Sequence, residues 1–542
     1  MEGRRKSACR QRPHRKRTSE MYLPHVGLVR IPAIGWAAWV LASAPGLVAA
    51  QVPDLGSDPQ SRTASTQSPA GSGAAARSGS DQPEPRASGQ WFEPRISVQH
   101  TVTNNSRLIH NGSGDQITEV MPGFRLARDT ARLKGFVDYT LRAVNYARDT
   151  SPDKIWHNLY ARGTVEAVED HVFVDVDGRA ALQPISAFGP AGGANTANTN
   201  LTQATSFSVS PYIKGDLTDG LSYEARYRMT DTRYDTAARS NVMVHDWLLQ
   251  LEKRPLGQLM SWTVEAAQQN AEYTNGRNID TTALRGRLGY MPRSGLRLVA
   301  IGGAESTNQL SPIRETSSIL GFGVDWRPSE RTSVSFERVK RYFGESHNAV
   351  AQYRTGRTVW RYTDKKSVVN GLGDQFGSPS PLYDLLDGFY MRTEPNAIRR
   401  MQLVQAEIER MGLPADMQVF QDFLTSSSKL QRLQNLSFAI LGQRSTLTVA
   451  VMRSDSRLLQ GAFSLGDDFS NDSKIRQRGW NISASHRLTP SSGVTLSFGE
   501  MRNSGVDTGL ETRTRPFIFS WTSLVARRTS VGLQLRRVLS DG

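Results

Sequence analysis

Residues 320–326 read Leu-Gly-Phe-Gly-Val-Asp-Trp, a run in which large apolar residues alternate with small or polar ones before Arg327-Pro328. Successive side chains of a β-strand point to opposite faces, so this run has one apolar face and one polar face. The same two-residue period recurs along the chain, for example over residues 221–229, 284–290, 494–499 and 531–536. From residue 91 onward the chain is therefore expected to be built of strands.

Three features favour a transmembrane barrel over a soluble β-sandwich, which has the same local alternation. The strands are commonly ten or more residues long, and a strand needs about 9–11 residues to cross a bilayer at a tilt. Tyr290, Trp326 and Trp521 lie where strands meet turns, as in an interfacial aromatic girdle. Short and long connections alternate, as on the two sides of an outer-membrane barrel. We predict an all-β fold, a large antiparallel transmembrane β-barrel.

The alternation of short and long connections also predicts the number of strands. It holds through the chain only if a turn at Thr355-Gly356 divides residues 347–363 into two strands. The count is then about 21 strands, within a range of 20–22, and the last covers residues 529–538. Because single-chain bacterial barrels normally have an even number of strands, we expect the closing strand to be missing from this count, either through truncation or because the count is off by one.

Residues 381–432 interrupt the strand pattern with a helical one. Thr393 can cap a helix in which Ile398, Met401, Val404 and Ile408 recur at helical spacing, and a second helix follows Asp416. The alternation of connections places this helical loop insertion on the extracellular side. It is either a lid or docking element for a partner, or a loop that packs its apolar stripe on the rim of the barrel.

The first ninety residues precede the barrel. Residues 1–50 combine a basic start, an apolar run over 31–50 and a small-residue end at Val48-Ala49-Ala50, which predicts a cleaved signal peptide starting at Met1 or Met21. An uncleaved helical anchor is the alternative. Residues 51–90 are rich in Ser, Gly, Ala and Pro and should form a disordered linker. The barrel domain is then residues 91–542.

Composition narrows the class further. Lys and Arg number 66 against 51 Asp and Glu, but the first fifty residues hold nine of these bases and two of these acids, so the remainder is only mildly basic. The mean hydropathy of −0.45 excludes a polytopic helical membrane protein. The single cysteine, Cys9, excludes a disulfide scaffold and cysteine-based metal or thiol chemistry in the body.

The motifs of known catalytic and cofactor sites are absent. There is no His-Glu-x-x-His, no Gly-x-Ser-x-Gly and no phosphate-binding Gly-x-x-x-x-Gly-Lys-Ser/Thr loop. His486, near Ser483 and Ser485, shares the apolar face of its strand, which is more typical of an interfacial residue than of a lipase-type base. We therefore expect no enzyme activity, no cofactor, no metal site and no nucleic-acid partner.

The polar strand faces should line the lumen, where charges tune selectivity. One interpretation is an electropositive passage for an acidic polysaccharide. The other is a wall whose arginines pair with acids on neighbouring strands and simply hold the barrel together. The lumen-facing candidates are Arg226, Arg228, Arg285, Arg287, Arg536, Glu224, Asp325 and Glu337.

Several segments resemble those of one family. They are Val102-Thr103-Asn104-Asn105, Val120-Met121-Pro122-Gly123-Phe124, and Tyr383-Asp384-Leu385-Leu386-Asp387-Gly388 followed by Arg399-Arg400 and Met411-Gly412-Leu413. The chain from Trp91 onward resembles the uncharacterised outer-membrane β-barrels associated with the PEP-CTERM/exosortase system and exopolysaccharide loci. The resemblance implies an export-related role and supplies no catalytic residues. Members tend to end on a strand that closes with an aromatic residue, whereas this chain ends Ser540-Asp541-Gly542.

Together these features predict an outer-membrane barrel that is a porin-like component of exopolysaccharide export or of the PEP-CTERM/exosortase envelope system. Its expected partners are outer-membrane lipid, an anionic exopolysaccharide and other export proteins. The alternative is a structural or docking barrel with a blocked lumen that recruits partners through its helical insertion.

Overall fold

The computed structural model describes residues 18–21, 25–31, 90–236, 239–254, 259–370, 386–387, 390, 394, 397–410, 423–425, 427–459 and 466–541. Most of the predicted signal peptide (1–50) and linker (51–90), and parts of the insertion, lie outside these residues.

Within the described residues, 21 strands follow one another from β3 to β23, which confirms the predicted all-β fold. Their bounds are β3 (Gln90–Thr103), β4 (Asp115–Asp129), β5 (Leu133–Tyr146), β6 (Lys154–Val168), β7 (Val172–Pro184), β8 (Leu201–Thr218), β9 (Leu221–Tyr234), β10 (Val242–Lys253), β11 (Met260–Tyr273), β12 (Ile279–Arg293), β13 (Leu296–Thr307), β14 (Glu315–Ser329), β15 (Thr332–Arg341), β16 (Gly344–Arg354), β17 (Thr358–Asn370), β18 (Ser428–Leu441), β19 (Ser445–Leu458), β20 (Lys474–Arg487), β21 (Ser492–Gly505), β22 (Glu511–Ala526) and β23 (Thr529–Asp541).

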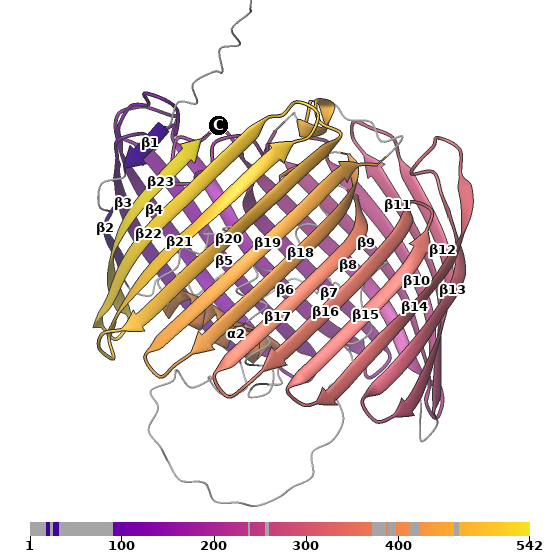
Figure 1. The fold of residues 1–542 in the computed structure, drawn as a ribbon. Coiled ribbons are helices and arrows are strands. Elements are labelled where there is room, and N and C mark those ends of the chain that lie inside the picture. The colour runs from indigo at the N-terminus through magenta and orange to yellow at the C-terminus, as the bar shows by residue number, and fades with distance from the viewer. Residues whose placement is uncertain are drawn as a thin grey trace, which may run out of the picture.

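Each of these strands pairs antiparallel with the next, and the strands tilt steeply around a barrel (Figure 1). With 21 strands in up-and-down order, β3 and β23 run in the same direction. Two short N-terminal strands, β1 (Thr18–Met21) and β2 (His25–Ile31), lie at this seam. β1 pairs antiparallel with β23, and β2 pairs antiparallel with both β23 and β3. An antiparallel strand at this position restores an even count around the ring.

The two ends of the barrel differ in their connections, and we name them the short-turn end and the long-loop end. The short-turn end carries the link between β4 and β5 and every second link after it, up to that between β22 and β23. The predicted turn at Thr355-Gly356 is present there, with the Thr355 amide donating to the Thr358 carbonyl at 2.8 Å. Gly295 is needed in the turn between β12 and β13, since its φ is +80° and a Cβ would lie 2.4 Å from the Arg327 carbonyl oxygen.

Two connections at the long-loop end differ from expectation. β15 and β16 are joined tightly through Tyr342 and Phe343, so this end also has a short link. The strand order predicts a long loop over residues 454–472, but β19 continues into it as far as Leu458. The strand continues because residues 453–457 still alternate between faces, although their outward side chains are charged rather than apolar.

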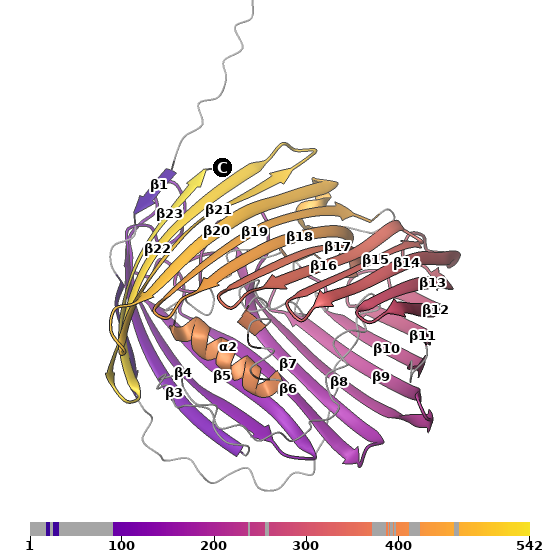
Figure 2. The same ribbon diagram turned by 60° about the horizontal axis from the view of Figure 1, so that its bottom comes forward.

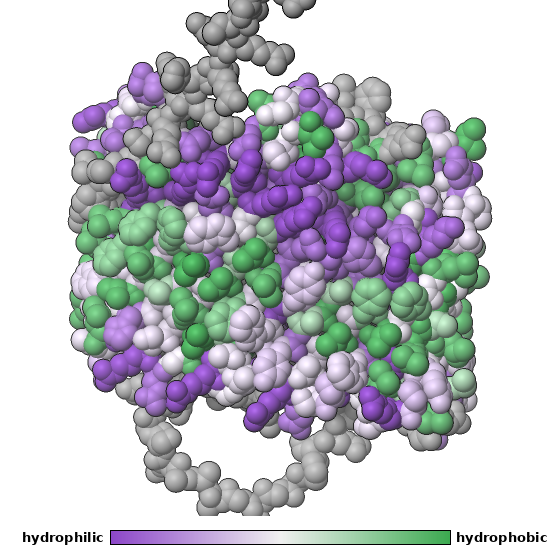
Figure 3. Space-filling model, viewed as in Figure 1, coloured by the Kyte–Doolittle hydropathy of each residue, from purple (hydrophilic) through white to green (hydrophobic). Residues whose placement is uncertain are grey.

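The apolar faces of the strands point outward. Leu320 and Phe322 are 61% and 52% exposed, whereas Ile319 between β13 and β15 is fully buried. Similar exposed apolar side chains follow one another around the wall, and Figure 3 shows them as a band nearer the short-turn end. A continuous exposed apolar band of this extent is typical of a surface that contacts lipid.

One longer helix, α2 (Ala397–Arg410), lies between β17 and β18 in the chain, within the predicted insertion. A single 3₁₀ turn, η2 (Asp468–Ser470), lies in the loop between β19 and β20. Among the described residues, no helix combines the length and the apolar character that a membrane span requires.

Candidate functional site

The interior of the barrel is lined by charged residues that neutralise one another. On β9 the Arg226 side chain is 6% exposed and lies between two carboxylates. Its Nε donates to Glu224 at 2.7 Å, and its Nη1 lies 3.4 Å from Asp175 on β7. The Tyr212 ring packs against the guanidinium at 3.8 Å from the ring centroid. Burial of the Arg226 guanidinium is tolerated because two carboxylates lie within its reach.

The other lumen candidates fall into two groups. Arg228 pairs with Asp246 at 2.8 Å, and Arg287 approaches Glu337 at 3.6 Å. Arg285, 5% exposed, lies opposite Glu265 in the register of β11 and β12. The remaining two candidates have no partner of opposite charge within salt-bridge distance among the described residues: Asp325 accepts from the Ser335 hydroxyl at 2.8 Å, and Arg536 leaves its Nε without a hydrogen-bond partner.

The loop between β7 and β8, residues 185–200, crosses the lumen at the long-loop end. Ala187 at its start packs with Ile475 of β20, and its carbonyl accepts a hydrogen bond from Asn503 of β21, on the far side of the ring. Its later residues contact the nearer wall, where the Tyr146 hydroxyl donates to the Thr196 carbonyl at 3.0 Å. Most of residues 194–200 are buried although they form no strand. The lumen is therefore spanned by chain that does not belong to the wall.

A second set of contacts holds this loop in place, and we name it the loop latch (Arg239, Asp467 and Asp468). Asp468 accepts from the Ser186 hydroxyl at 2.7 Å and from the Ala187 amide at 2.6 Å. Arg239 donates to the Ile185 carbonyl at 2.7 Å and to the Gly466 carbonyl at 3.2 Å. Asp467 accepts from the Thr425 hydroxyl at 2.6 Å. Loops that lie far apart in the sequence are thus joined above the lumen.

Burial shifts the pKa values of two residues of the loop latch, Asp468 and Arg239. The pKa of Asp468 is raised mainly because burial disfavours the charged carboxylate, and hydrogen bonds from Ser186 and Ala187 partly oppose that rise. The pKa of the Arg239 guanidinium is lowered by burial, with Asp467 and Asp468 opposing the change. Each group offsets part of the desolvation penalty of the other, so the latch depends on both.

Helix α2 lies inside the barrel, against the inner wall formed by β3 to β6 (Figure 2). Met401 packs with Ala127 and Phe136, and Val404 on the same stripe packs with Leu386. Arg400 fixes the preceding segment by donating to Asp387 at 2.7 Å. We expected an insertion on the extracellular rim. The helix lies in the lumen instead, where its apolar stripe packs on inward-facing Ala127 and Phe136, with Trp91 and Tyr160 beside them.

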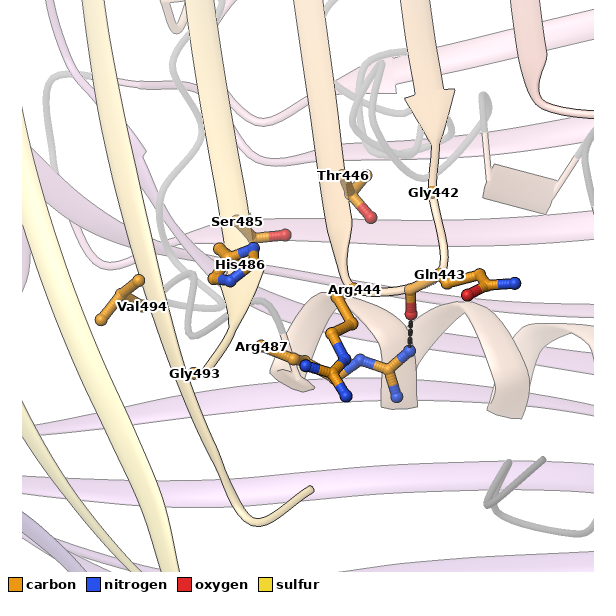
Figure 4. Close-up of a pocket in the computed structure, with 9 residues that line it drawn as sticks. All are labelled: Gly442, Gln443, Arg444, Thr446, Ser485, His486, Arg487, Gly493 and Val494. Atoms are coloured by element: carbon orange, nitrogen blue, oxygen red, sulfur yellow. Dashed lines mark hydrogen bonds between the residues drawn. The ribbon is translucent and has the colours of Figure 1, made fainter. Parts of the chain in front are cut away.

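His486 lies at the short-turn end in a shallow pocket that also contains Arg444 and Arg487 (Figure 4). It faces outward and its Nδ1 lies 2.8 Å from the Ser445 hydroxyl of β19, rather than from Ser483 or Ser485. None of the nine residues that line the pocket is acidic, so no carboxylate is placed to orient the imidazole as a catalytic base would require. Among the described residues, no group of three or more His, Cys, Asp or Glu could hold a metal ion.

Sequence reasoning placed the strand charges inside the barrel but missed the latch. Asp467, Asp468 and Arg239 belong to loops whose sequences carry no motif, and their meeting depends on how three loops fold over the mouth. The only available signal was the length of the loop over residues 183–203, since a long ordered loop is commonly functional.

No family model and no curated protein matches the chain. Among solved structures, it is similar to the siderophore receptor PirA from Pseudomonas aeruginosa, with 8% identity, a TM-score of 0.38, and coverage of 83% of this chain and 81% of that one. It is also similar to the FrpB iron transporter from Neisseria meningitidis in its apoprotein form, with 10% identity, a TM-score of 0.39, and coverage of 82% and 87%. Pseudomonas aeruginosa OccK2 (OpdF) has 10% identity and a TM-score of 0.29, with coverage of 83% and 96%. At such identities and TM-scores, function has to be argued from the residues of this chain.

Proposed function

We propose that this chain is a bacterial outer-membrane barrel that conducts a hydrated, polar substrate and is held closed by chain folded into its own lumen. The observation that carries the proposal is the pairing of two surfaces. The outer wall carries an exposed apolar band, and the inner wall carries charges and hydroxyl groups. The loop over residues 185–200 and helix α2 occupy the interior at two different levels.

More specifically, we propose a role in exopolysaccharide export or in the PEP-CTERM/exosortase envelope system. The sequence resemblance supplies the system. The inner wall supports the substrate class, because a polysaccharide is hydrated and forms hydrogen bonds along its whole length. Partly exposed inward-facing hydroxyls such as those of Thr230, Thr263 and Ser335 could exchange such bonds with it, and Arg536, which has no salt-bridge partner among the described residues, would present positive charge to an anionic chain.

A docking barrel with a permanently blocked lumen is the second candidate. The loop latch favours it, since several hydrogen bonds would have to break together before the mouth opened. The apolar packing of α2 on the inner wall also favours a blocked barrel, because movement of the helix away from the wall would expose Met401 and Phe136 to water.

Conductance of single barrels in planar bilayers distinguishes the two candidates. The wild-type chain is compared with a variant in which a short Gly/Ser linker replaces residues 381–427 and alanine replaces Asp468, so that both closures are removed, and with a control that shortens the linker before β3. A conduit predicts rare openings for the wild type and the control, and frequent or permanent openings for the deletion. A barrel that inserts and stays silent in all three forms would reject conduction and favour docking.

A further inference from the structure

The outer wall carries a row of four arginines on neighbouring strands, beyond the apolar band toward the long-loop end. In the strand register Arg453 of β19 lies opposite Arg478 of β20, Arg478 lies opposite Arg502 of β21, and Arg502 lies opposite Arg513 of β22. We name these four residues the arginine row. Like charges directly opposite one another on a sheet destabilise it, so the row costs stability unless something else neutralises it.

The row faces outward rather than into the lumen. Arg453 shares the face of Val451, which is 45% exposed, and the side chains of Arg502 and Arg513 are themselves 55% and 41% exposed. On β19 and β20 the next outward residues toward the short-turn end are Val451 and Trp480. On β21 and β22 a charged residue, Glu500 or Arg515, lies between the row and the first apolar residue, Phe498 or Phe517. Figure 3 shows the transition as a change from green to purple across β18–β22. If the green band lies in the hydrocarbon of the membrane, the arginine row lies at the level of lipid headgroups.

Carboxylates neutralise only part of this charge. Arg453 pairs with Asp455 at 2.9 Å, Arg502 with Glu511 at 2.9 Å, and Arg513 with Glu500 at 2.6 Å. Arg478, in the middle of the row and exposed, has no ion-pair partner among the residues that the structure describes. The outward positions of β18–β22 in this half of the barrel hold nine basic and three acidic residues: the basic ones are Arg432, Arg453, Arg457, Lys474, Arg476, Arg478, Arg502, Arg513 and Arg515. Two of the nine pair with acids on the flanking strands, Arg432 with Asp364 at 2.6 Å and Arg515 with Asp541 at 3.6 Å, and a smaller surplus of positive charge remains.

The opposite side of the barrel lacks this feature. Outward positions near the long-loop end of β4, β5 and β6 carry Thr118, Asn145 and Ile155. The cationic surface therefore does not run around the whole ring, although exposed Arg338 and Lys340 continue it as far as β15.

We propose that the arginine row binds the phosphate groups of an anionic, multiply phosphorylated glycolipid in the membrane leaflet at the long-loop end. Guanidinium groups bind phosphate oxygens through paired hydrogen bonds, and they remain charged at any physiological pH. Neighbouring strands lie about 4.8 Å apart, so four arginines span roughly 14 Å, enough to contact two phosphates of one headgroup. The acyl chains of such a lipid would lie on the apolar band directly below the row. This inference rests on the membrane placement in the proposed function, but not on conduction.

Native mass spectrometry of the folded chain in detergent micelles tests the proposal with three probes: bisphosphoryl lipid A, monophosphoryl lipid A and phosphatidylglycerol. The test variant is Arg453→Gln/Arg478→Gln/Arg502→Gln. The matched control is Arg354→Gln/Arg357→Gln/Arg444→Gln, which removes the same charge from the short-turn end. Heat-modifiable migration on gels verifies that each variant is folded, and the single variant Arg478→Gln replaces the triple variant if the latter fails to fold.

The expected result is wild-type affinity that falls from the bisphosphorylated to the monophosphorylated probe and is lowest for phosphatidylglycerol. The triple variant should lose about a hundredfold in affinity for the first probe, at roughly fivefold per arginine, while the control keeps wild-type affinity. Equal losses in the triple variant and the control would overturn the proposal. So would a folded triple variant that binds like the wild type, or equal affinity for all three probes. Since binding is measured without conductance, a silent channel that binds the lipid rejects the proposed function alone.

Discussion

The loop latch predicts that removing one carboxylate opens the barrel. In Asp468→Ala the Ser186 hydroxyl and the Ala187 amide lose the acceptor that now lies 2.7 and 2.6 Å away. Hydrogen bonds to a charged group contribute about 1.5–3 kcal/mol each, and the two do not add fully because they share one half-buried carboxylate. Recovery of its desolvation penalty offsets part of the loss. We therefore expect the closed state to lose about 2–3 kcal/mol relative to the open state.

A change of that size shifts the ratio of open to closed barrels by roughly thirty- to a hundredfold, because each 1.36 kcal/mol is a factor of about ten. The assay is the open probability of single barrels in planar bilayers. Asp468→Asn, which keeps one acceptor oxygen, should show a smaller increase. Asp507→Ala is the matched control, since Asp507 accepts hydrogen bonds from Ser473, including its amide at 2.6 Å, and not from the described residues of the loop over 185–200. An Asp468→Ala variant that opens no more often than this control would refute the role of the latch.

Three further predictions concern other parts of the chain. Arg226→Met leaves the carboxylates of Asp175 and Glu224 buried without their cation and should cost about 3–5 kcal/mol in urea unfolding, and a loss below 1 kcal/mol would show that the pair is dispensable. Burial raises the pKa of Asp468, so the closed state binds a proton on this carboxylate more readily than the open state does. Open probability should therefore fall or stay level as the pH drops through the raised pKa, and it should rise at higher pH. Opening on mild acidification would contradict this sign. Intact-mass measurement of membrane-inserted protein should give a mature chain that starts after Ala50. A measured mass that includes the β2 residues would contradict cleavage there and would mean that β2 belongs to the seam between β3 and β23.

Most of the fold could be predicted from sequence because a lipid-facing strand repeats one simple physical signal. Apolar residues alternate with polar ones wherever a strand contacts lipid on one face, and Thr355-Gly356 shows that even a hidden turn can be located from the order of the connections. The signal ends where the strand leaves the apolar band. β19 pairs with β20 beyond residue 454, where the sequence pattern indicates a loop, and its outward residues there, Asp455 and Arg457, are charged rather than apolar.

The interior was less accessible to prediction. The alternation of side chains between the two faces of a strand places Arg226 and Arg287 in the lumen. It also suggests their partners, since Glu224 lies on the same face of β9 and Glu337 on a nearby strand. This alternation carries no information about loops and helices that fold into the lumen. Helix α2 packs beside Phe136, and the latch loops contact one another, through residues that are far apart in sequence. These residues belong to no repeating pattern.

Lipid quenching of single labelled positions most directly tests the central claim, that the barrel crosses the membrane with its apolar face toward lipid and its polar face toward the lumen. Bimane is attached to single cysteines in a Cys9→Ser background, at the outward positions Leu284, Leu320 and Phe498 and at the inward positions Arg285, Asp325 and Ser497. In vesicles containing brominated lipid we expect strong quenching at the first three positions and little at the other three. Equal quenching on both faces, or none at either, would contradict the account.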